Sequence, residues 1–237
     1  MNSTISGKWP QRALRLAGAG VLVTALSACG VSRVDEVSVK WPSFKSGTPV
    51  VLPSDPAQCP DLAGTYRAQG EFRSGDRETT ALNDLRNFFL YTLDLPGMRD
   101  TLLPEWRSTP EATVALSRVD GGWRVLAQDG QGARSTALLP MLNGAQDPAA
   151  LSGDANANRP DGVRRHTGCT QGRLWVSVRN DWRQYESMGV MRHVAIFRPD
   201  AGGLLVTVQR ESDSIGMLPW YSNDSSVFQY WFARIAP

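Results

Sequence analysis

Histidine and cysteine are scarce in this chain, which has two histidines and three cysteines among its 237 residues. After residue 29, the histidine and cysteine side chains that a metal ion could use are Cys59, His166, Cys169 and His193. Structural zinc sites take such ligands in closely spaced pairs, and neither a C-x-x-C nor an H-x-x-x-H pattern is present. The sequence therefore predicts no metal site.

Local motifs of catalytic sites are missing as well. The G-x-S-x-G pattern of many serine hydrolases is absent, and no acidic partner is evident for His166 or His193. Four glutamates could still meet in space as the acid and base of a glycosidase, although no local spacing unites them: Glu71, Glu105, Glu186 and Glu211. We expect no catalytic residue and no cofactor, and an enzymatic role stays open as the alternative.

One polar stretch has the alternating oxygen donors of a calcium-binding loop, from Asp154 to Asn158. However, Arg159 occupies the position of the turn glycine, and Arg165 stands where the bidentate acid belongs. Two arginines would repel the cation. We therefore interpret residues 151–168 as a long loop.

Long apolar runs are limited to one, Leu16 to Leu26, which follows three basic residues and precedes Ser27 and Ala28. This is the three-part layout of a secretory signal, and the run is shorter than the roughly 20 residues of a spanning helix. Leu26-Ser27-Ala28-Cys29 resembles the bacterial lipobox, in which the cysteine receives a diacylglycerol before cleavage. The sequence predicts a signal peptide of residues 1–28 and a lipidated Cys29; an ordinary secretory signal would instead leave that thiol free.

A strongly basic surface is lacking too. Residues 1–28 hold three of the 25 basic residues and no acidic one, so 22 basic residues face 23 acidic ones after cleavage, a net charge of −1. Nucleic-acid binding depends on clustered bases that neutralise phosphates, so we expect no nucleic-acid partner. Lysine occurs only at positions 8, 40 and 45, and we attribute the preference for arginine to genome composition rather than to anion binding.

With Cys29 assigned to lipid, Cys59 and Cys169 remain as an even pair. An exported protein enters an oxidising compartment, so we predict a structural disulfide between them. Residues 29–57 contain four prolines and little apolar periodicity apart from a short strand around 34–39, which indicates a lipidated tether. The remaining residues, 58–237, suit a single β-rich periplasmic domain.

Period-two alternation dominates that domain and predicts seven strands: 64–72, 112–119, 123–128, 174–180, 190–197, 204–210 and 227–235. Glycine-containing turns at 120–122 and 199–203 predict two hairpins. Leu82, Leu85 and Phe89 recur at near-helical spacing, which predicts one helix around residues 80–91. The expected fold is mainly β, an antiparallel meander that forms a half-open barrel or sandwich with about one helix.

Two groups of residues are candidates for a binding surface. On the strand after Cys169, Leu174, Val176 and Val178 form one face, so we expect the opposite face, with Arg173, Trp175 and Arg179, to be wet. Trp220 and Tyr221 lie together in a polar loop and offer an aromatic platform. Trp123 and Trp231 fall on strand patterns and should belong to the core.

Residues 59–66 read Cys-Pro-Asp-Leu-Ala-Gly-Thr-Tyr, and the chain ends close after the aromatic run 230–232. With the lipobox, these stretches resemble a group of poorly characterised proteobacterial envelope lipoproteins. The resemblance implies an envelope location and no particular activity. Some lipoproteins of comparable size are immunity proteins that neutralise secreted toxins, which is an analogy of class.

These observations favour a non-enzymatic lipoprotein that is held at the membrane by acylated Cys29 and binds a protein partner in the periplasm, toxin immunity being one form of that role. Gly30 follows the cysteine. The resemblance to lipoproteins of two-membrane bacteria, in which an aspartate at this position signals retention in the inner membrane, implies the outer membrane. The alternative is an envelope enzyme or a glycan-binding protein that acts on peptidoglycan or lipid.

Overall fold

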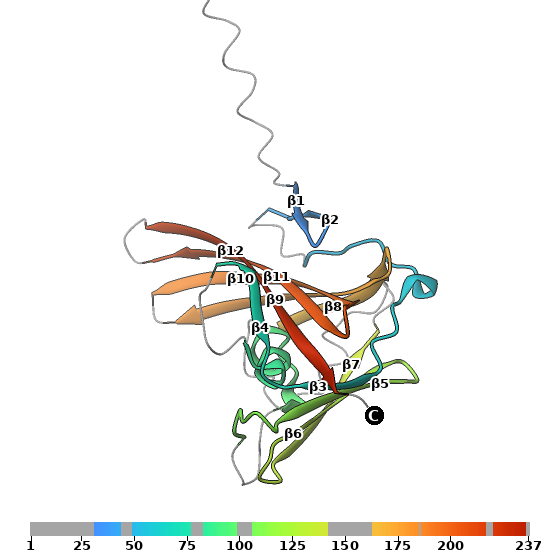
Figure 1. Ribbon diagram of the computed structural model, residues 1–237. Coiled ribbons are helices and arrows are strands. Elements are labelled where there is room, and N and C mark those ends of the chain that lie inside the picture. The colour runs from blue at the N-terminus through green and yellow to red at the C-terminus, as the bar shows by residue number, and fades with distance from the viewer. Residues whose placement is uncertain are drawn as a thin grey trace, which may run out of the picture.

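The chain folds mainly into antiparallel strands, as the sequence predicts. The computed structural model describes residues 31–43, 49–76, 83–98, 106–141, 163–184, 186–216 and 220–235. Ten strands form one sheet in the order β7-β6-β5-β3-β12-β11-β10-β9-β8, with β4 also paired to β12 (Figure 1). These strands are β3 (Gly64–Arg67), β4 (Glu71–Gly75), β5 (Thr113–Val119), β6 (Gly122–Gln128), β7 (Arg134–Pro140), β8 (Val163–Thr170), β9 (Arg173–Gln184), β10 (Ser187–Asp200), β11 (Gly203–Ile215) and β12 (Tyr221–Ile235).

Strand β12 connects two layers of this sheet. From Tyr221 to Ala233 it pairs with β11, whereas its last residues, Arg234 and Ile235, pair with β3. The strands β8–β12 with β4 form one layer, and β3, β5, β6 and β7 form the other. Among the described strands, the edges β7 and β8 do not pair with each other, so the sheet is a half-open sandwich and not a closed barrel.

The core lies between the layers and around a short helical segment. α1 (Leu85–Asn87) continues into the π-helical turn η4 (Phe88–Thr92), and η5 (Pro96–Met98) follows. Phe88 and Phe89 pack on Phe197 of β10, with ring centroids 5.7 and 5.9 Å apart. Side chains of both layers, including Trp123 and Leu174, line a void of about 10 Å³. This void is about the size of one water molecule, so this part of the interior is packed rather than a ligand cavity.

The helix is shorter than the predicted 80–91 and begins later. Asp84 is its N-cap, since the backbone is extended there and the carboxylate accepts a hydrogen bond from the amide of Asn87 at 2.9 Å. Helical spacing of apolar residues therefore located the segment but not its first residue. Residues 77–82 are outside the described part of the chain.

The structure corrects the sequence predictions at three places: a strand that is divided, a strand that was not predicted, and a predicted loop that is a strand. The predicted strand 64–72 is divided into β3 and β4, because the amide of Ala68 bonds to Ala112 while its carbonyl accepts from Leu85. Strand β7, with buried Ser135, Ala137 and Leu139, was not predicted. Residues 163–168 belong to β8, which pairs along its whole length with β9, so the loop predicted over 151–168 is wrong for them.

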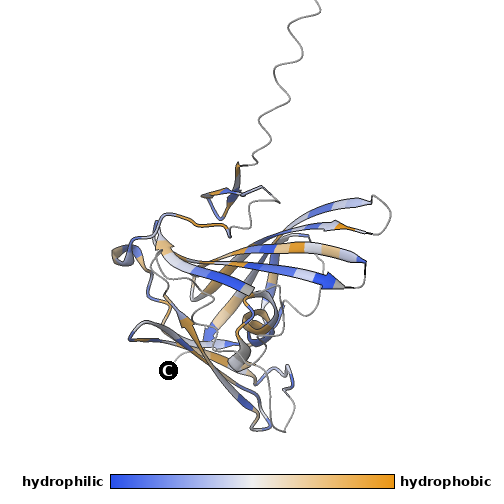
Figure 2. Cartoon of the chain, turned by 180° about the vertical axis from the view of Figure 1, so that it is seen from behind, coloured by the Kyte–Doolittle hydropathy of each residue, from blue (hydrophilic) through white to orange (hydrophobic). Residues whose placement is uncertain are grey.

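The four strands β9–β12 extend beyond their predicted ends. Their hairpins continue past the core, where polar residues on both faces hide the alternation that marks a half-buried strand. Figure 2 shows these hairpins from behind, projecting to one side of the helical segment. The predicted turns at 120–122 and 199–203 are present between β5 and β6 and between β10 and β11.

Within the segment interpreted as a tether, the described residues include a folded hairpin. β1 (Val31–Val34) and β2 (Val37–Lys40) form a hairpin on the outer face of the sheet (Figure 1). Its inward side chains join residues 50 and 52 against three residues of β9 and β10: the cluster is Val34, Val37, Val39, Trp41, Val50, Leu52, Trp175, Val194 and Ile196. Residues 31–41 and 49–52 therefore form part of the folded unit, because their valines alternate in register with an apolar patch of the sheet.

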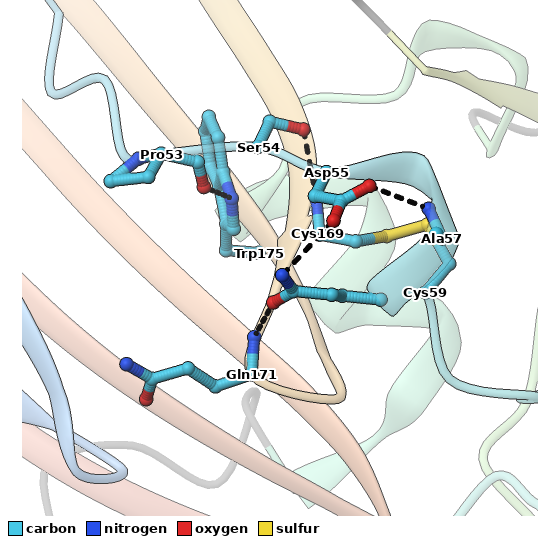
Figure 3. The surroundings of a disulfide bond; sticks show 9 residues. Pro53, Ser54, Asp55, Ala57, Cys59, Cys169, Gln171 and Trp175 are labelled. Carbon is cyan, nitrogen blue, oxygen red and sulfur yellow. Dashed lines mark hydrogen bonds between the residues drawn. A yellow bond between two sulfur atoms is a disulfide. The ribbon is translucent and has the colours of Figure 1, made fainter.

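The predicted disulfide is present between Cys59 and Cys169, with Cα atoms 4.9 Å apart (Figure 3). Figure 3 shows Pro53, Ser54 and Asp55 beside the strand that carries Cys169. The amide of Asp55 donates to the carbonyl of Cys169 at 2.8 Å, and Ser54 Oγ accepts from the Cys169 amide at 3.2 Å. The short 3-10 helix η2 (Pro56–Gln58) leads into Cys59. The bond thus fixes the chain from residue 53 to residue 59 along β8.

Candidate interaction surface

The predicted wet face of β9 is largely covered. Trp175 is 2% exposed beneath the β1–β2 hairpin, and its indole N–H donates to the carbonyl of Pro53 at 3.2 Å. Arg179 is 3% exposed and forms an ion pair with Asp181 at 2.8 Å. The assignment of Trp175 and Arg179 to a binding surface is therefore wrong, because a second layer of chain lies on this face.

Arg173 attaches the N-terminal hairpin to the sheet. Its guanidinium contacts Asp35 at 2.9 Å and Glu36 at 2.8 Å, and these two residues form the turn between β1 and β2. Arg198 of β10 contacts the same Asp35 carboxylate at 3.1 Å. Arg173 is thus engaged in holding this hairpin in place and is not available as a docking group.

Farther along the same face, Arg192 of β10 organises a buried polar cluster. Its Nη2 lies 2.7 Å from an oxygen of Asp213 and 3.2 Å from an oxygen of Glu211. Asp213 is 2% exposed and also accepts hydrogen bonds from the Tyr221 hydroxyl and the Asn223 amide, each at 2.7 Å. Every oxygen of this buried carboxylate therefore has a donor.

The cluster changes the acidity of two of its members. Burial raises the pKa of Glu211, an effect that the positive charge of Arg192 opposes and the negative charge of Asp213 reinforces. The pKa of Tyr221 is raised chiefly by its hydrogen bond to the Asp213 carboxylate. The Tyr221 phenol is consequently kept protonated and fixed in direction.

Large apolar side chains are exposed where the long hairpins end. The register pairs Met188 with Ile215 and Ile215 with Tyr221, so these three residues stand side by side on one face of β10, β11 and β12. Their exposed fractions are 48, 40 and 61%, and Trp220, directly before β12, is 72% exposed. We call these four residues the hairpin-end patch.

The hairpin-end patch contains two predicted residues and two that the sequence did not reveal. Trp220 and Tyr221 were recognisable as adjacent aromatics in a polar stretch. Met188 and Ile215 were not, since neither lies beside an aromatic residue in the sequence, and only the strand register brings them together. Tyr221 connects the patch to the buried cluster, because its hydroxyl bonds to Asp213 while its ring stays exposed.

The two histidines lie on opposite faces of the sheet. His166 pairs with Ser177 and hence lies in line with Val194, whereas His193 is the neighbour of Val194 and points to the other face. The cysteines form a disulfide. The four residues considered as zinc ligands therefore do not come together at one site. Among the described residues, no group of three or more histidine, cysteine, aspartate or glutamate side chains is arranged to hold a metal ion.

The His193 side chain on the inner face of the sheet predicts a pH dependence of stability. It is 7% exposed, and burial, with Arg210 as a second cause, lowers its pKa from 6.5 to about 4. Below pH 6.5 the unfolded chain binds a proton that the folded chain does not, so stability should be lost as the pH falls from about 6.5 to about 4. The loss should reach about 3 kcal/mol at pH 4, by the relation of about 1.4 kcal/mol per pKa unit.

Urea unfolding from pH 7 to pH 4 measures this contribution. His193→Gln should remove about 3 kcal/mol of the pH dependence, since glutamine does not titrate. An identical pH dependence in wild type and His193→Gln would contradict the assignment.

The other residues considered for chemistry are dispersed. Glu71 of β4 pairs with Arg73 at 3.1 Å, Glu211 belongs to the Arg192 cluster, and Glu186 is exposed between β9 and β10. Cys29, Glu105 and residues 154–158 are outside the described residues. In the part of the chain that the structure describes, no helix is both long enough and apolar enough to cross a membrane.

In the described part of the chain, the hairpin-end patch is thus an exposed apolar surface supported by a buried polar cluster, and the disulfide lies at the opposite end of the β8–β9 pair. Comparison with known proteins adds no relative to this description. No protein-family model matches the chain, and no curated protein or solved structure matches it either.

Proposed function

We propose that the chain is a lipid-anchored lipoprotein of the bacterial cell envelope, non-enzymatic, whose domain binds a protein partner through the hairpin-end patch. The lipobox at residues 26–29 supports the anchor. The observation that carries the binding role is the exposure of Met188, Ile215, Trp220 and Tyr221 at one end of the sheet. The lipobox cysteine followed by Gly30 supports a location on the outer membrane, facing the periplasm.

The composition of the patch suits a protein partner. Aromatic residues and methionine are enriched in protein interfaces, where a few such side chains supply most of the binding energy. The hydrogen bond from Tyr221 to Asp213 holds one ring in place before binding, which reduces the entropy that association costs. A secreted toxin that the protein neutralises is one partner of this kind.

A second candidate function is glycan binding, favoured by the adjacent exposed rings of Trp220 and Tyr221. Aromatic rings form platforms for the apolar faces of sugars, and peptidoglycan is the glycan of this compartment. Under this alternative the aromatic pair would be needed, whereas Met188 and Ile215 would contribute little.

Photocrosslinking distinguishes these functions. A benzophenone amino acid is placed at position 220 in cells, with position 91 as the control because Tyr91 is a similarly exposed aromatic, at 66%, on the helical segment. A discrete protein adduct at position 220 and none at position 91 is the expected result. Adducts with muropeptides alone would favour the glycan role, and a lack of any adduct at 220 would overturn the proposal.

Substitutions then test the patch itself. Trp220→Ser and Met188→Ser should each weaken binding of the crosslinked partner by about tenfold or more, because truncation of such anchors costs about 2 kcal/mol. Tyr91→Ser is the matched control and should leave binding unchanged. Thermal melting should be unaffected in all three variants, since the side chains are exposed. Equal binding by Trp220→Ser and wild type would count against the interface.

A further inference from the structure

We propose that the outward surface of the β1–β2 hairpin lies directly on the phospholipid headgroups, so that the domain is held against the membrane rather than at the end of a tether. This inference rests on the proposed acylation of Cys29. The hairpin would then mark the membrane-facing side of the domain, and its lipid contact would be with anionic headgroups.

Chain length gives the first argument. Gly30 is the only residue between Cys29 and Val31, where β1 begins. Two residues span at most about 7 Å, at about 3.3–3.6 Å per residue. Because β1 and β2 pack on Trp175, Val194 and Ile196, the hairpin is part of the folded unit. An acyl group on Cys29 therefore brings the membrane surface to the beginning of β1.

Alternation along the hairpin determines which side chains face away from the sheet. Ser32 faces inward, where its hydroxyl donates to Gln209 at 2.7 Å, and the buried valines share this side. The exposed residues on the outward side are Val31, Arg33, Ser38 and Lys40. The register pairs Val31 with Lys40 and Arg33 with Ser38, so these four form one surface, which we call the anchor-side patch.

The charge of the anchor-side patch complements anionic headgroups. Arg33 and Lys40 make no ion pair with another described residue, whereas the acids of the hairpin, Asp35 and Glu36, are engaged by Arg173. The outward charge is thus positive. A basic side chain near an anionic leaflet contributes attraction that acts over about a Debye length, and long basic side chains place their charge at headgroup level.

The position of the hairpin also determines what remains accessible. It covers the outer face of β9 and β10, whereas the layer of β5, β6 and β7 lies on the inner side (Figure 1). The β5–β6 turn at Asp120 is therefore on the layer away from the membrane. The hairpin-end patch lies beyond the covered part of the sheet but on the same face as the β1–β2 hairpin, since Met188 alternates in step with Val194 and Ile196. A partner bound there would therefore lie beside the hairpin, close to the membrane surface.

Depth-dependent quenching tests this orientation. The acylated protein is labelled with an environment-sensitive fluorophore at Ser38→Cys or at Asp120→Cys, while Cys59 and Cys169 stay paired. It is reconstituted into vesicles of phosphatidylethanolamine and phosphatidylglycerol that carry a headgroup nitroxide quencher. Quenching should be at least threefold stronger at position 38 than at position 120. Equal quenching at the two positions, or none at 38, would overturn the proposal.

A charge variant and a flotation control complete the experiment. Arg33→Glu with Lys40→Glu should at least halve the ratio of quenching at position 38 to that at 120, and an unchanged ratio would refute the headgroup contact. Flotation with vesicles and acyl labelling are measured on every sample. If the protein neither floats nor carries an acyl group, the lipoprotein proposal fails; if it floats without quenching at 38, only the orientation fails.

Discussion

Replacement of both Cys59 and Cys169 by alanine is expected to lower the free energy of unfolding by about 2–5 kcal/mol. The bond closes a loop with a sequence separation of 110 residues, which contains the helical segment, β3 to β7 and β8. In the chain-entropy account, a loop of this length restricts the unfolded chain by about 4.7 kcal/mol. Cys169 is fully buried, so the loss includes its packing as well.

Urea unfolding of Cys59→Ala/Cys169→Ala against the oxidised wild type measures this loss. Ser54→Ala is the matched control, because it removes only the hydrogen bond to the Cys169 amide and should cost about 1 kcal/mol. Reduction of the wild type with dithiothreitol should produce a smaller loss than the double variant, because reduction breaks the crosslink but keeps the buried Cys169 side chain. A double variant as stable as Ser54→Ala would show that the crosslink contributes little.

The strands were predictable where the core imposes alternation, and less so elsewhere. Val176, Val178, Val206 and Val208 alternate because one face of each strand is buried in the core. Strand β8 was hidden, since Arg164, Arg165 and His166 give it the composition of a loop and only pairing with β9 makes it a strand. The composition of a segment indicates whether its side chains are polar, but it does not indicate whether its backbone pairs with another strand.

The N-terminal hairpin shows a second limit. Its turn consists of Asp35 and Glu36, both with positive φ, 44° and 69°, a conformation for which glycine or asparagine is the usual signal. Neither glycine nor asparagine is present, and ion pairs with Arg173 hold the turn instead. Such pairs join residues that are far apart in sequence. Without the turn, the short valine pattern resembled an isolated strand within a linker.

The binding surface illustrates the same distinction. Adjacent Trp220 and Tyr221 were identified from the sequence, because the polar run Ser222 to Ser226 that follows them lacks the alternation of a core strand. Alternation showed that Trp175 and Arg179 lie on the face opposite the valines, but not that β1 and β2 cover this face. Alternation separates two faces of a strand, and tertiary contacts decide which of them meets water.

Arg192→Leu is expected to destabilise the fold by about 3–5 kcal/mol, because the substitution leaves the buried carboxylate of Asp213 and the half-buried carboxylate of Glu211 without their cation. Asp213 is 2% exposed and lies 2.7 Å from the guanidinium of Arg192, and Glu211 lies 3.2 Å from it. Arg73→Leu is the exposed counterpart, since its pair with Glu71 has side chains 45 and 64% exposed, and it should cost less than about 1 kcal/mol.

The pH dependence of the Arg192→Leu variant tests the cause of the loss. Arg192 lowers the pKa of Glu211, so its removal should raise that pKa and let protonation relieve the repulsion with Asp213. The deficit relative to wild type should therefore shrink as the pH falls from 7 to 5 in urea unfolding. A deficit that stays constant over this range would indicate lost packing rather than unpaired charge.

Because Asp213 also orients the Tyr221 hydroxyl, the same variant should reduce crosslinking from position 220. Stability of the buried cluster and presentation of the hairpin-end patch are thus expected to fall together.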